Sequence, residues 1–337
     1  MPAELGDLSI VIVTWHSSGD VGPLLASLAR VLAGGAELVV VENASGDATP
    51  KVVCAAVPEA RLIVNDWNRG FAAAANQGLA ASRGAFVLFV NPDAVVLDDA
   101  IARALAYADG DPAIGIVGCR TLNANGKPQP TVDRFHTAGG LVAEALIGRR
   151  GLRARPRGVV PVTSGDVDWV YGSFLLCRRA ALTAVGGFDE AYEMYGEDLD
   201  LCHRVRAAGF RVVYCAEATI VHRGNRSGAL RYGGDRDVAV LKGTLRFFRR
   251  RRGAGAECAF RLLAGTSFVV KALVNAVWAL GPGGAPAGTR ARLYARMVRL
   301  CARGDPAAAG RSPAGGDAAV LPAERLRSPV APGIQKR

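Results

Sequence analysis

The sequence predicts an α/β fold in which helices flank a mostly parallel central sheet. Short β-branched runs such as residues 9–13 contain no polar alternation, which is typical of strands covered on both faces. Alanine-rich segments of helical character separate these runs along the first 120 residues. Half of the 337 residues are hydrophobic and 21% are charged, so the chain can bury a large core.

The expected strands of the first half are residues 8–14, 37–42, 61–64, 85–90 and 114–119. Ligands of open parallel sheets bind at the carboxyl ends of the strands. The segments that follow these strands are therefore the first candidates for a binding site: residues 14–16, 42–45, 65–70 and 91–93.

Regular structure is expected to break between residues 120 and 166, where turn sequences such as NANG at 123–126 indicate a long excursion over the site. Order is expected to return at 169–177. Further along, the sequence predicts helices at 179–185 and 197–208, strands at 211–215 and 218–221, a basic helix that ends in four arginines at 249–252, an apolar segment at 259–280, and a disordered tail beyond Arg303.

Charge is unevenly distributed, with a net charge of −3 up to Ala239 and +14 from Val240 onward. The basic residues gather in the tail without an RNA-binding or DNA-binding motif, so nucleic acid is not an expected partner. Lys271 interrupts the most apolar segment, 262–281, which argues against a spanning helix. An anionic membrane surface is the partner that arginines beside an apolar face would fit.

Seven cysteines form no C-x-x-C pair, and several stand among apolar residues, which predicts buried thiols in a reducing compartment. The first nine residues carry Glu4 and Asp7 and no basic residue, unlike a secretory signal. The expected location is therefore the cytoplasm.

The tripeptide Asn91-Pro92-Asp93 follows the fourth expected strand, and its carboxylate is placed to hold a divalent cation against a diphosphate. A turn that caps a helix beginning near Asp98 explains the same residues equally well. His222 also follows a strand, but a lone histidine is more often structural than a ligand. A ligand role for His222 is supported only if it shares a site with Asp93.

Gly70 stands between a polar loop and a helical segment, where close backbone approach and a helix N-terminus suit a nucleotide phosphate. Glycine-rich loops are common, so this motif alone is weak evidence.

Three carboxylates, Glu197, Asp198 and Asp200, cluster at the start of an expected helix, a position that the helix dipole alone would favour. On a helical wheel Asp198 shares the apolar face with Cys202, which would raise its pKa and suits a general base. Asp200 points elsewhere, one turn from Arg204, which predicts a surface ion pair.

Taken together, these segments resemble the family-two inverting glycosyltransferases of the GT-A nucleotide-sugar fold, within them the rhamnosyltransferase-like group of cell-surface polysaccharide synthesis. The matching stretches occur in the family's order: IVIVTW at 10–15, VVENASGD at 40–47, NRGF at 68–71, NPD at 91–93, GSFLLCRR at 172–179, and GFDE at 187–190 through EDLD at 197–200 to His222.

The resemblance implies roles for individual residues. The base and ribose would contact residues after the first two strands, namely Thr14, Glu42, Asn43 and Ser45. The nucleotide would be bordered by Asn68 and Gly70, with Asn91 beside its diphosphate. Asp93 and His222 would hold Mg²⁺ or Mn²⁺, and Asp198 would be the catalytic base. Trp169, by stacking on a sugar face, and Glu197 would contact the acceptor.

Three positions depart from the family pattern. Glu42 replaces the usual aspartate of the second motif, and His16 replaces a frequent asparagine of the first. Asn91 replaces the first carboxylate of the Asp-x-Asp metal motif. A neutral amide is a weak ligand, so Asp93 would provide most of the metal binding.

The implied reaction is a single displacement with inversion, in which a sugar passes from a nucleotide sugar, dTDP-rhamnose by subgroup, to a lipid-linked glycan. The implied domains are a GT-A catalytic domain at 1–235, with a nucleotide-binding half at 1–120 and an acceptor half at 121–235, a helical extension at 236–302, and a disordered tail at 303–337. The basic extension would place the enzyme peripherally on the inner face of the cell membrane.

Two other functions fit part of the pattern. A sugar-nucleotide pyrophosphorylase shares the nucleotide-binding sheet and a metal, but its basic glycine-rich loop is missing after the first strand, at 14–18. A non-catalytic membrane-surface scaffold fits the basic tail, but not the presence of Asp93 and Asp198.

Overall fold

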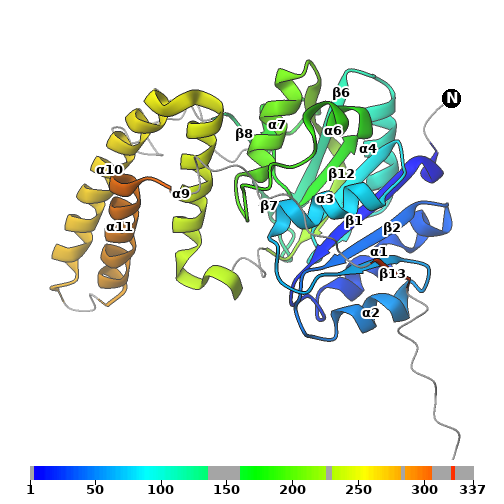
Figure 1. Ribbon diagram of the computed structural model, residues 1–337, viewed down its shortest axis with the longest axis horizontal. Coiled ribbons are helices and arrows are strands. Elements are labelled where there is room, and N and C mark those ends of the chain that lie inside the picture. Colours follow the sequence, from blue (N-terminus) through cyan, green and yellow to red (C-terminus); the bar gives the residue numbers. More distant parts are fainter. Residues whose placement is uncertain (1–3, 136–159, 225–229, 282–284, 306–319, 323–337) are drawn as a thin grey trace, which may run out of the picture.

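A mixed sheet lies at the centre of the protein, and helices cover both of its faces (Figure 1). The computed structural model describes residues 4–135, 160–224, 230–281, 285–305 and 320–322. The main sheet has the strand order β13-β3-β2-β1-β4-β11-β6-β12-β5, with β7 beside β6 and β9 beside β12. Its strands are β1 (Leu8–Thr14), β2 (Glu37–Glu42), β3 (Arg61–Val64), β4 (Phe86–Val90), β5 (Ala94–Val96), β6 (Ile114–Leu122), β7 (Pro128–Gln129), β9 (Gly165–Asp166), β11 (Phe174–Arg178), β12 (Arg211–His222) and β13 (Val320–Pro322), and a separate pair is formed by β8 (Val132–Asp133) and β10 (Trp169–Val170).

Nine α-helices are described in these residue ranges. They are α1 (Val21–Ala33), α2 (Thr49–Ala56), α3 (Phe71–Ala81), α4 (Ala100–Asp109), α6 (Arg179–Val185), α7 (Glu197–Ala207), α9 (Arg236–Phe247), α10 (Gly253–Trp278) and α11 (Ala285–Arg303). Shorter helical turns are η1 (Leu5–Asp7), η2 (Gly233–Asp235) and η3 (Phe248–Arg252).

The first four strands of the chain form the parallel part of the sheet. β1 pairs parallel with β2 and β4, and β2 pairs parallel with β3. β11 lies antiparallel between β4 and β6, whereas β6 and β12 are parallel. The expected fold class is confirmed, and the sheet becomes mixed beyond β4.

Two hydrophobic cores, one on each face of the sheet, explain the uninterrupted apolar runs of its strands. Ile10 and Ile12 of β1 belong to the core beneath α1, α2 and α4, whereas Val11 belongs to the core beneath α3, α6 and α7. Helix α3 lies so close to β1 that a side chain at position 78 would collide with Val11, and Gly78 permits this approach. Every residue of β4 is buried, as expected for a central strand with helices on both faces.

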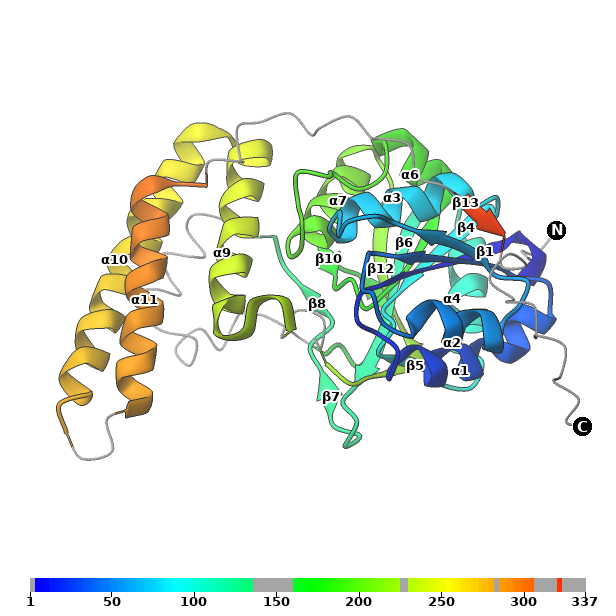
Figure 2. The ribbon, with the colours of Figure 1, turned by 60° about the horizontal axis from the view of Figure 1, so that its bottom comes forward.

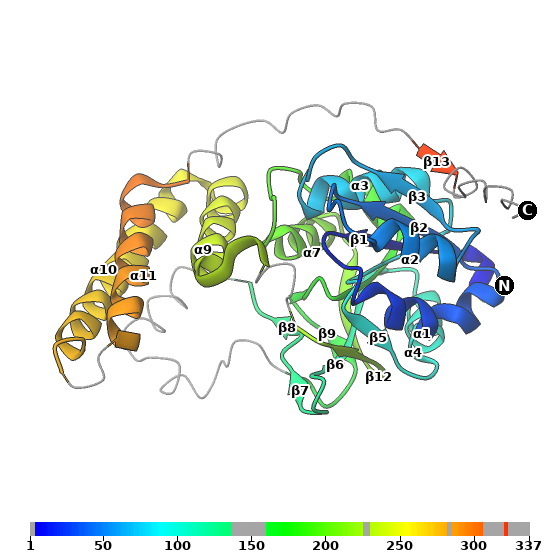
Figure 3. The same ribbon diagram turned by 90° about the horizontal axis from the view of Figure 1, so that it is seen from below.

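The C-terminal extension (α9 to α11) forms a third hydrophobic core of its own, made of Leu241, Leu245, Phe248, Phe260, Met297 and Cys301. In Figures 1 and 2, α10 and α11 lie side by side beyond α9, away from the sheet. Figure 3 shows the same order from below.

The arginine run at 249–252, in η3 directly after α9, is divided between two surroundings. Arg250 bonds to Asp189 at 2.8 Å, and Arg251 bonds to the same carboxylate at 2.9 Å. Asp189 lies between α6 and α7 in the domain built on the sheet. These two arginines therefore join the extension to that domain, whereas Arg249 and Arg252 are exposed.

Several predicted boundaries need correction. β6 continues to Leu122, and β12 runs unbroken to His222 through an irregularity after Cys215. The excursion at 120–166 contains the short strands β7, β8 and β9 where it is described, and residues 136–159 lie outside the described part. We expected the tail after Arg303 to be disordered. Within this tail, β13 pairs with β3, and most of the other residues lie outside the described part of the chain. All seven cysteines are free, and five are buried.

Candidate active site

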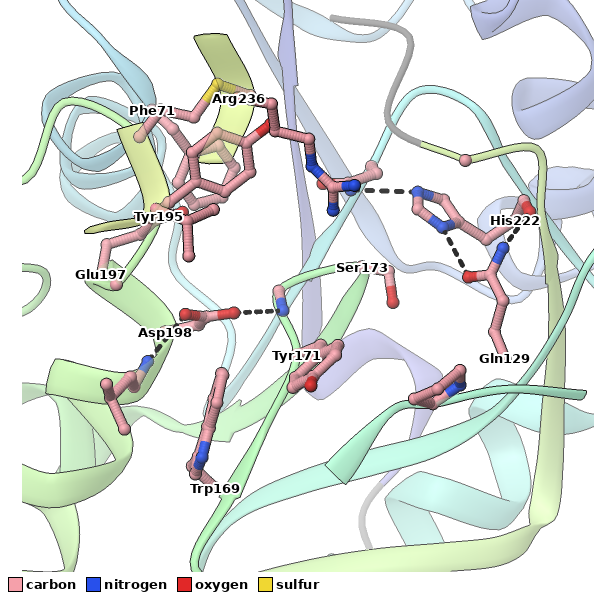
Figure 4. Close-up of a pocket in the computed structure, with 18 of the residues that line it drawn as sticks. Phe71, Gln129, Trp169, Tyr171, Ser173, Tyr195, Glu197, Asp198, His222 and Arg236 are labelled. Atoms are coloured by element: carbon pink, nitrogen blue, oxygen red, sulfur yellow. Dashed lines mark hydrogen bonds between the residues drawn. The ribbon is translucent and has the colours of Figure 1, made fainter. Parts of the chain in front are cut away.

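A pocket of about 740 Å³ opens where the carboxyl ends of β4 and β12 meet the start of α7 (Figure 4). Helix α9 closes one side of this pocket, so the extension contributes Arg236, Val240 and Thr244 to its wall. The lining residues are Phe71, Asn91, Gln129, Pro130, Trp169, Tyr171, Gly172, Ser173, Met194, Tyr195, Gly196, Glu197, Asp198, Leu199, His222, Gly224, Arg236, Val240 and Thr244.

Asp198 lines the pocket from the first turn of α7. Its Oδ2 accepts a hydrogen bond from the Gly172 amide at 2.9 Å, and its Oδ1 accepts one from the Leu199 amide at 2.8 Å. Burial raises the pKa of Asp198 to about 6, while these two backbone donors oppose the shift. The carboxylate is thus held in one orientation and is more basic than an ordinary aspartate.

Glu197 also lines the pocket but is more deeply placed, with 8% of its surface exposed. Its Oε2 is buried and makes no hydrogen bond within the described residues. Burial, reinforced by the neighbouring Asp198 charge, raises the pKa of Glu197 to about 8. Glu197 therefore carries a proton near neutral pH, and a protonated carboxyl group can donate a hydrogen bond to a substrate.

Asp200 is the most buried of the three carboxylates, contrary to the surface position predicted from the helical wheel. The expected pairing with Arg204 is present at 2.7 Å, but the carboxylate is fully buried. Its Oδ1 also accepts a hydrogen bond from the Tyr192 hydroxyl at 3.2 Å and one from Arg251 at 2.5 Å. The helical wheel predicted the wrong exposure because Tyr192 and Arg251, which cover the Asp200 carboxylate, lie outside α7.

Asp93 and His222 meet across the β4 and β12 strand ends, although they lie 129 positions apart in the sequence. Asp93 Oδ1 is 3.2 Å from His222 Nε2, and both side chains are largely buried. Asn91 Nδ2 lies 3.3 Å from the same imidazole nitrogen. One carboxylate and one imidazole are a donor set that fits a divalent cation completed by phosphate oxygens. No cluster of three or more potential protein ligands occurs in the described ranges.

Of the predicted nucleotide-contacting residues, Asn91 lines this pocket, and those of the loops after β1, β2 and β3 do not. Asn43 is their centre, because its Nδ2 donates to Asn68 Oδ1 and to the Gly70 carbonyl, both at 3.1 Å. Its Oδ1 accepts from Asn65 Nδ2 and the Arg69 amide, both at 3.0 Å. The Asn43 side chain therefore has its full hydrogen-bonding capacity in use and shapes the loop before α3.

The loops after β1 and β2 are joined through Ser45. The Ser45 amide donates to Glu42 Oε1 at 2.8 Å, and the serine hydroxyl accepts from the His16 amide at 2.8 Å. His16 and Ala44 adopt left-handed backbone angles, with φ of 49° and 59°. Thr14 is fully buried at the end of β1. Strained, mutually bonded loops at strand ends are typical of ligand sites.

Trp169 lines the pocket as predicted, and it is not alone. Its ring centroid lies 4.7 Å from that of Tyr171, which lines the same wall. Figure 4 shows both rings beneath Asp198 and Ser173. Two neighbouring aromatic rings provide an apolar platform of the kind that binds sugar faces.

The pocket residues that sequence reasoning missed include Gln129, Tyr171, Tyr195 and Arg236. The NANG turn that positions Gln129 is visible in the sequence, but the turn pattern alone predicts only irregular structure there. Tyr195 has a φ of 70° next to Gly196 at 95°, and sequence alone carries no signal for this strain. Arg236, which reaches over the pocket from α9 in Figure 4, belongs to a helix that was assigned wholly to the extension.

Comparison with known proteins decides the family. The profile of the family described as "Glycosyltransferase like family 2" matches residues 6–232, about two thirds of the chain. The chain belongs to glycosyltransferase family 2. This membership confirms the resemblance, and it argues against the pyrophosphorylase and scaffold alternatives.

Curated relatives of this glycosyltransferase include rhamnosyltransferases, which support the rhamnosyltransferase-like subgroup. N-acetylglucosaminyl-diphospho-decaprenol L-rhamnosyltransferase of Mycobacterium tuberculosis is 30% identical over 233 residues, covering 64% of this chain and 75% of the relative. Rhamnosyltransferase WbbL of Escherichia coli is 29% identical over 174 residues, 50% of this chain and 62% of the relative.

The fold of the glycosyltransferase is also that of solved enzymes. A mannosyltransferase of Pyrobaculum calidifontis, PcManGT, solved with GDP-Man and Mn²⁺, superposes with a TM-score of 0.51 at 16% identity. The match covers 89% of this chain and 86% of the mannosyltransferase. At this identity the likeness supports the GT-A fold.

Proposed function

We propose that this glycosyltransferase transfers rhamnose from dTDP-rhamnose, with inversion, to a lipid-linked glycan acceptor in cell-surface polysaccharide synthesis. The observation that carries the proposal is the position of Asp198 on the pocket wall, across from His222 in Figure 4. The rhamnosyl donor and the lipid-linked acceptor are supported by the name of the mycobacterial relative.

Asp198 would act as the catalytic base. An acceptor hydroxyl gives its proton to the carboxylate while its oxygen attacks the anomeric carbon from the face opposite the nucleotide. The bond from the sugar to the diphosphate breaks as the new glycosidic bond forms, so configuration inverts. The Gly172 and Leu199 amides keep the carboxylate oriented, and its raised pKa strengthens it as a base.

Asp93 and His222 would hold the divalent cation, Mg²⁺ or Mn²⁺, with Asn91 beside the diphosphate. When bound, such a cation offsets the negative charge that develops on the departing diphosphate. The single carboxylate in this pair means that substrate oxygens must complete the coordination sphere. The affinity for metal should therefore rise when the nucleotide is present.

The remaining donor contacts are assigned to the loops around Asn43. Thr14, Glu42 and Ser45 would form the base and ribose side, with Asn43, Asn68 and Gly70 forming the loop that borders the nucleotide. We assign Trp169 and Glu197 to the acceptor, Trp169 as a stacking surface and Glu197 as a hydrogen-bond donor. The catalytic domain would span 1–235 with Arg236, Val240 and Thr244 of the extension completing its pocket.

The hairpin of α10 and α11 would bind the membrane that carries the acceptor. α10 exposes an apolar stripe that includes Leu273, Val277 and Trp278, the last at 74% exposure. On α11, Arg290, Arg292 and Arg299 are exposed and would attract anionic headgroups, at about 1 kcal/mol each. The exposed Arg249 and Arg252 would add to this basic surface.

Binding at the inner face of the membrane follows from a cytoplasmic nucleotide-sugar donor and a lipid-linked acceptor. Lys271 is less of an obstacle to deeper insertion than the sequence suggested, because its ammonium group lies over the Phe268 ring at 5.5 Å. By length and composition alone, the continuous helical stretch Leu230–Trp278 contains a segment that meets the requirements for crossing a bilayer. We favour a peripheral arrangement, since α11 packs along α10 as a hairpin.

Nucleotide release from a panel of nucleotide sugars, with a polyprenyl-diphosphate sugar as acceptor and Mn²⁺ or Mg²⁺ present, tests the proposal. We expect dTDP-rhamnose to be used best. His222→Ala and Asp93→Ala should lower metal-dependent release far more than they lower the melting temperature. Faster release from a UDP or GDP sugar would refute the donor assignment, and full activity in excess chelator would refute the metal assignment.

A further inference from the structure

Gln129 lies at the end of a hairpin that the NANG turn builds between β6 and β7. Gln129 pairs with Thr121 across this hairpin, and the turn is closed by hydrogen bonds from the Asn123 amide to the Lys127 carbonyl at 2.7 Å and from the Gly126 amide to the Asn123 carbonyl at 2.9 Å. The hairpin places the Gln129 side chain against His222 on the pocket wall (Figure 4).

A chain of hydrogen bonds fixes which way the Gln129 amide points. Asn123 Nδ2 donates to the Lys127 carbonyl at 3.0 Å, which leaves Asn123 Oδ1 as an acceptor. Gln129 Nε2 donates to that oxygen at 2.7 Å and to the His222 carbonyl at 3.0 Å. Rotating the amide by half a turn would set its oxygen against two other oxygens, so Oε1 must face the imidazole.

The orientation of Gln129 in turn selects the tautomer of His222. Gln129 Oε1 lies 3.1 Å from His222 Nδ1 and can only accept a hydrogen bond, so Nδ1 must carry the proton. Nε2 is then the ring nitrogen that faces the rest of the site, with Asn91 Nδ2 at 3.3 Å and Asp93 Oδ1 at 3.2 Å. A proton on Nε2 would be shared with the Asp93 carboxylate, and a bound cation would displace it.

We propose that Gln129 is a positioning residue that keeps a proton on His222 Nδ1, so that Nε2 is the nitrogen that faces Asp93 and is left for a cation. Ligating histidines generally bond through their second ring nitrogen to an acceptor that fixes their orientation. The inference deepens the proposed metal site and rests on it for its functional meaning. The tautomer itself is a property of the chain alone.

The direct test is a long-range ¹H–¹⁵N spectrum of the metal-free full chain at pH about 8.5, where histidines are generally neutral. His222→Asn identifies the resonances of this ring by removing them. We expect a protonated Nδ1 in the natural protein and, in Gln129→Met, a proton moved to Nε2, where the Asp93 carboxylate can accept it. An unprotonated Nδ1 in the natural protein would overturn the inference, as would an unchanged pattern in Gln129→Met.

Mn²⁺ binding in the presence of dTDP gives a second readout. Gln129→Met should weaken Mn²⁺ binding about 10-fold to 100-fold. Gln129→Glu retains an acceptor for Nδ1–H but loses the donor to Asn123 Oδ1 and the His222 carbonyl, so it should recover only part of the affinity. Equal loss in both variants would contradict the positioning role. If the natural chain bound no Mn²⁺ yet kept the proton on Nδ1, the metal assignment would fail and the role of Gln129 would stand. The spectrum of the natural chain decides the position of the proton even if a variant does not fold.

Discussion

Arg251, in η3, places its Nε 2.5 Å from Oδ1 of Asp200, a fully buried carboxylate in α7. Arg204 bonds to the other oxygen of the same carboxylate at 2.7 Å. Asp200 lies two residues after Asp198, so the contact joins the C-terminal extension to the helix that carries the candidate base. The extension is consequently part of the active-site architecture.

Asp200→Asn should destabilise the protein strongly. The substitution leaves two arginines beside a neutral amide in a buried site, and removing one partner of a buried ion pair costs about 3–5 kcal/mol. Chemical denaturation of the full chain measures the loss, with the exposed Glu193→Gln as a control expected to change stability by less than about 1 kcal/mol. Equal stability of both variants would show that the cluster contributes little.

The contribution of Glu197 to stability should fall as pH rises from about 4.5 to about 8, because the folded protein keeps a proton on Glu197 that the unfolded chain has released. Glu197→Gln carries no charge at any pH, so its free energy of unfolding should vary less over this window and exceed that of the natural chain near pH 8. Urea titrations at both ends of the window measure this difference. Identical pH dependence in the two proteins would show that Glu197 ionises normally.

The rate of transfer should decline below pH about 6. An ordinary aspartate would cause this decline only at a lower pH. Burial raises the pKa of Asp198 to about 6, and only its ionised form can accept a proton. The pH profile of kcat/KM reports this acid limb in the free enzyme. A profile that stays flat down to pH about 4 would contradict the assignment of a buried base.

Membrane binding should depend on the apolar stripe of α10. Leu273→Ser combined with Trp278→Ser removes two side chains that are 63% and 74% exposed, and should reduce flotation with anionic vesicles. Trp67→Ser is the matched control, since Trp67 is 60% exposed on the domain built on the sheet. If the control lost as much binding as the double variant, the hairpin would not be the membrane site.

The sequence predicted those parts of the fold in which local pattern and burial agree. Ile10, Val11 and Ile12 face two different cores, so β1 had to be apolar throughout, and a parallel strand could be recognised from it. Family motifs also brought Asp93 and His222 together, and the structure places them 3.2 Å apart.

The wrong predictions concerned residues whose contacts are made by segments distant in the sequence. The burial of Asp200 comes from Arg251, 51 residues further along, and no helical wheel of α7 contains that information. The pocket wall formed by Arg236 follows from the docking of α9, which rests on long-range packing. The role of Asn43 beside the nucleotide stays a prediction; its side-chain amide bonds to Asn65, Asn68, Arg69 and Gly70, and the residue type alone does not reveal these contacts.

The central claim is that Asp198 removes the proton from the acceptor hydroxyl. Asp198→Asn keeps the shape of the side chain and removes its ability to accept that proton, and a positioned general base contributes about 10²–10⁴ in rate. The decisive measurement is single-turnover transfer by this variant, alongside the binding of its nucleotide sugar. We predict nearly normal binding and a loss of transfer of at least about a hundredfold. Transfer at close to the natural rate by a folded Asp198→Asn protein would contradict the account.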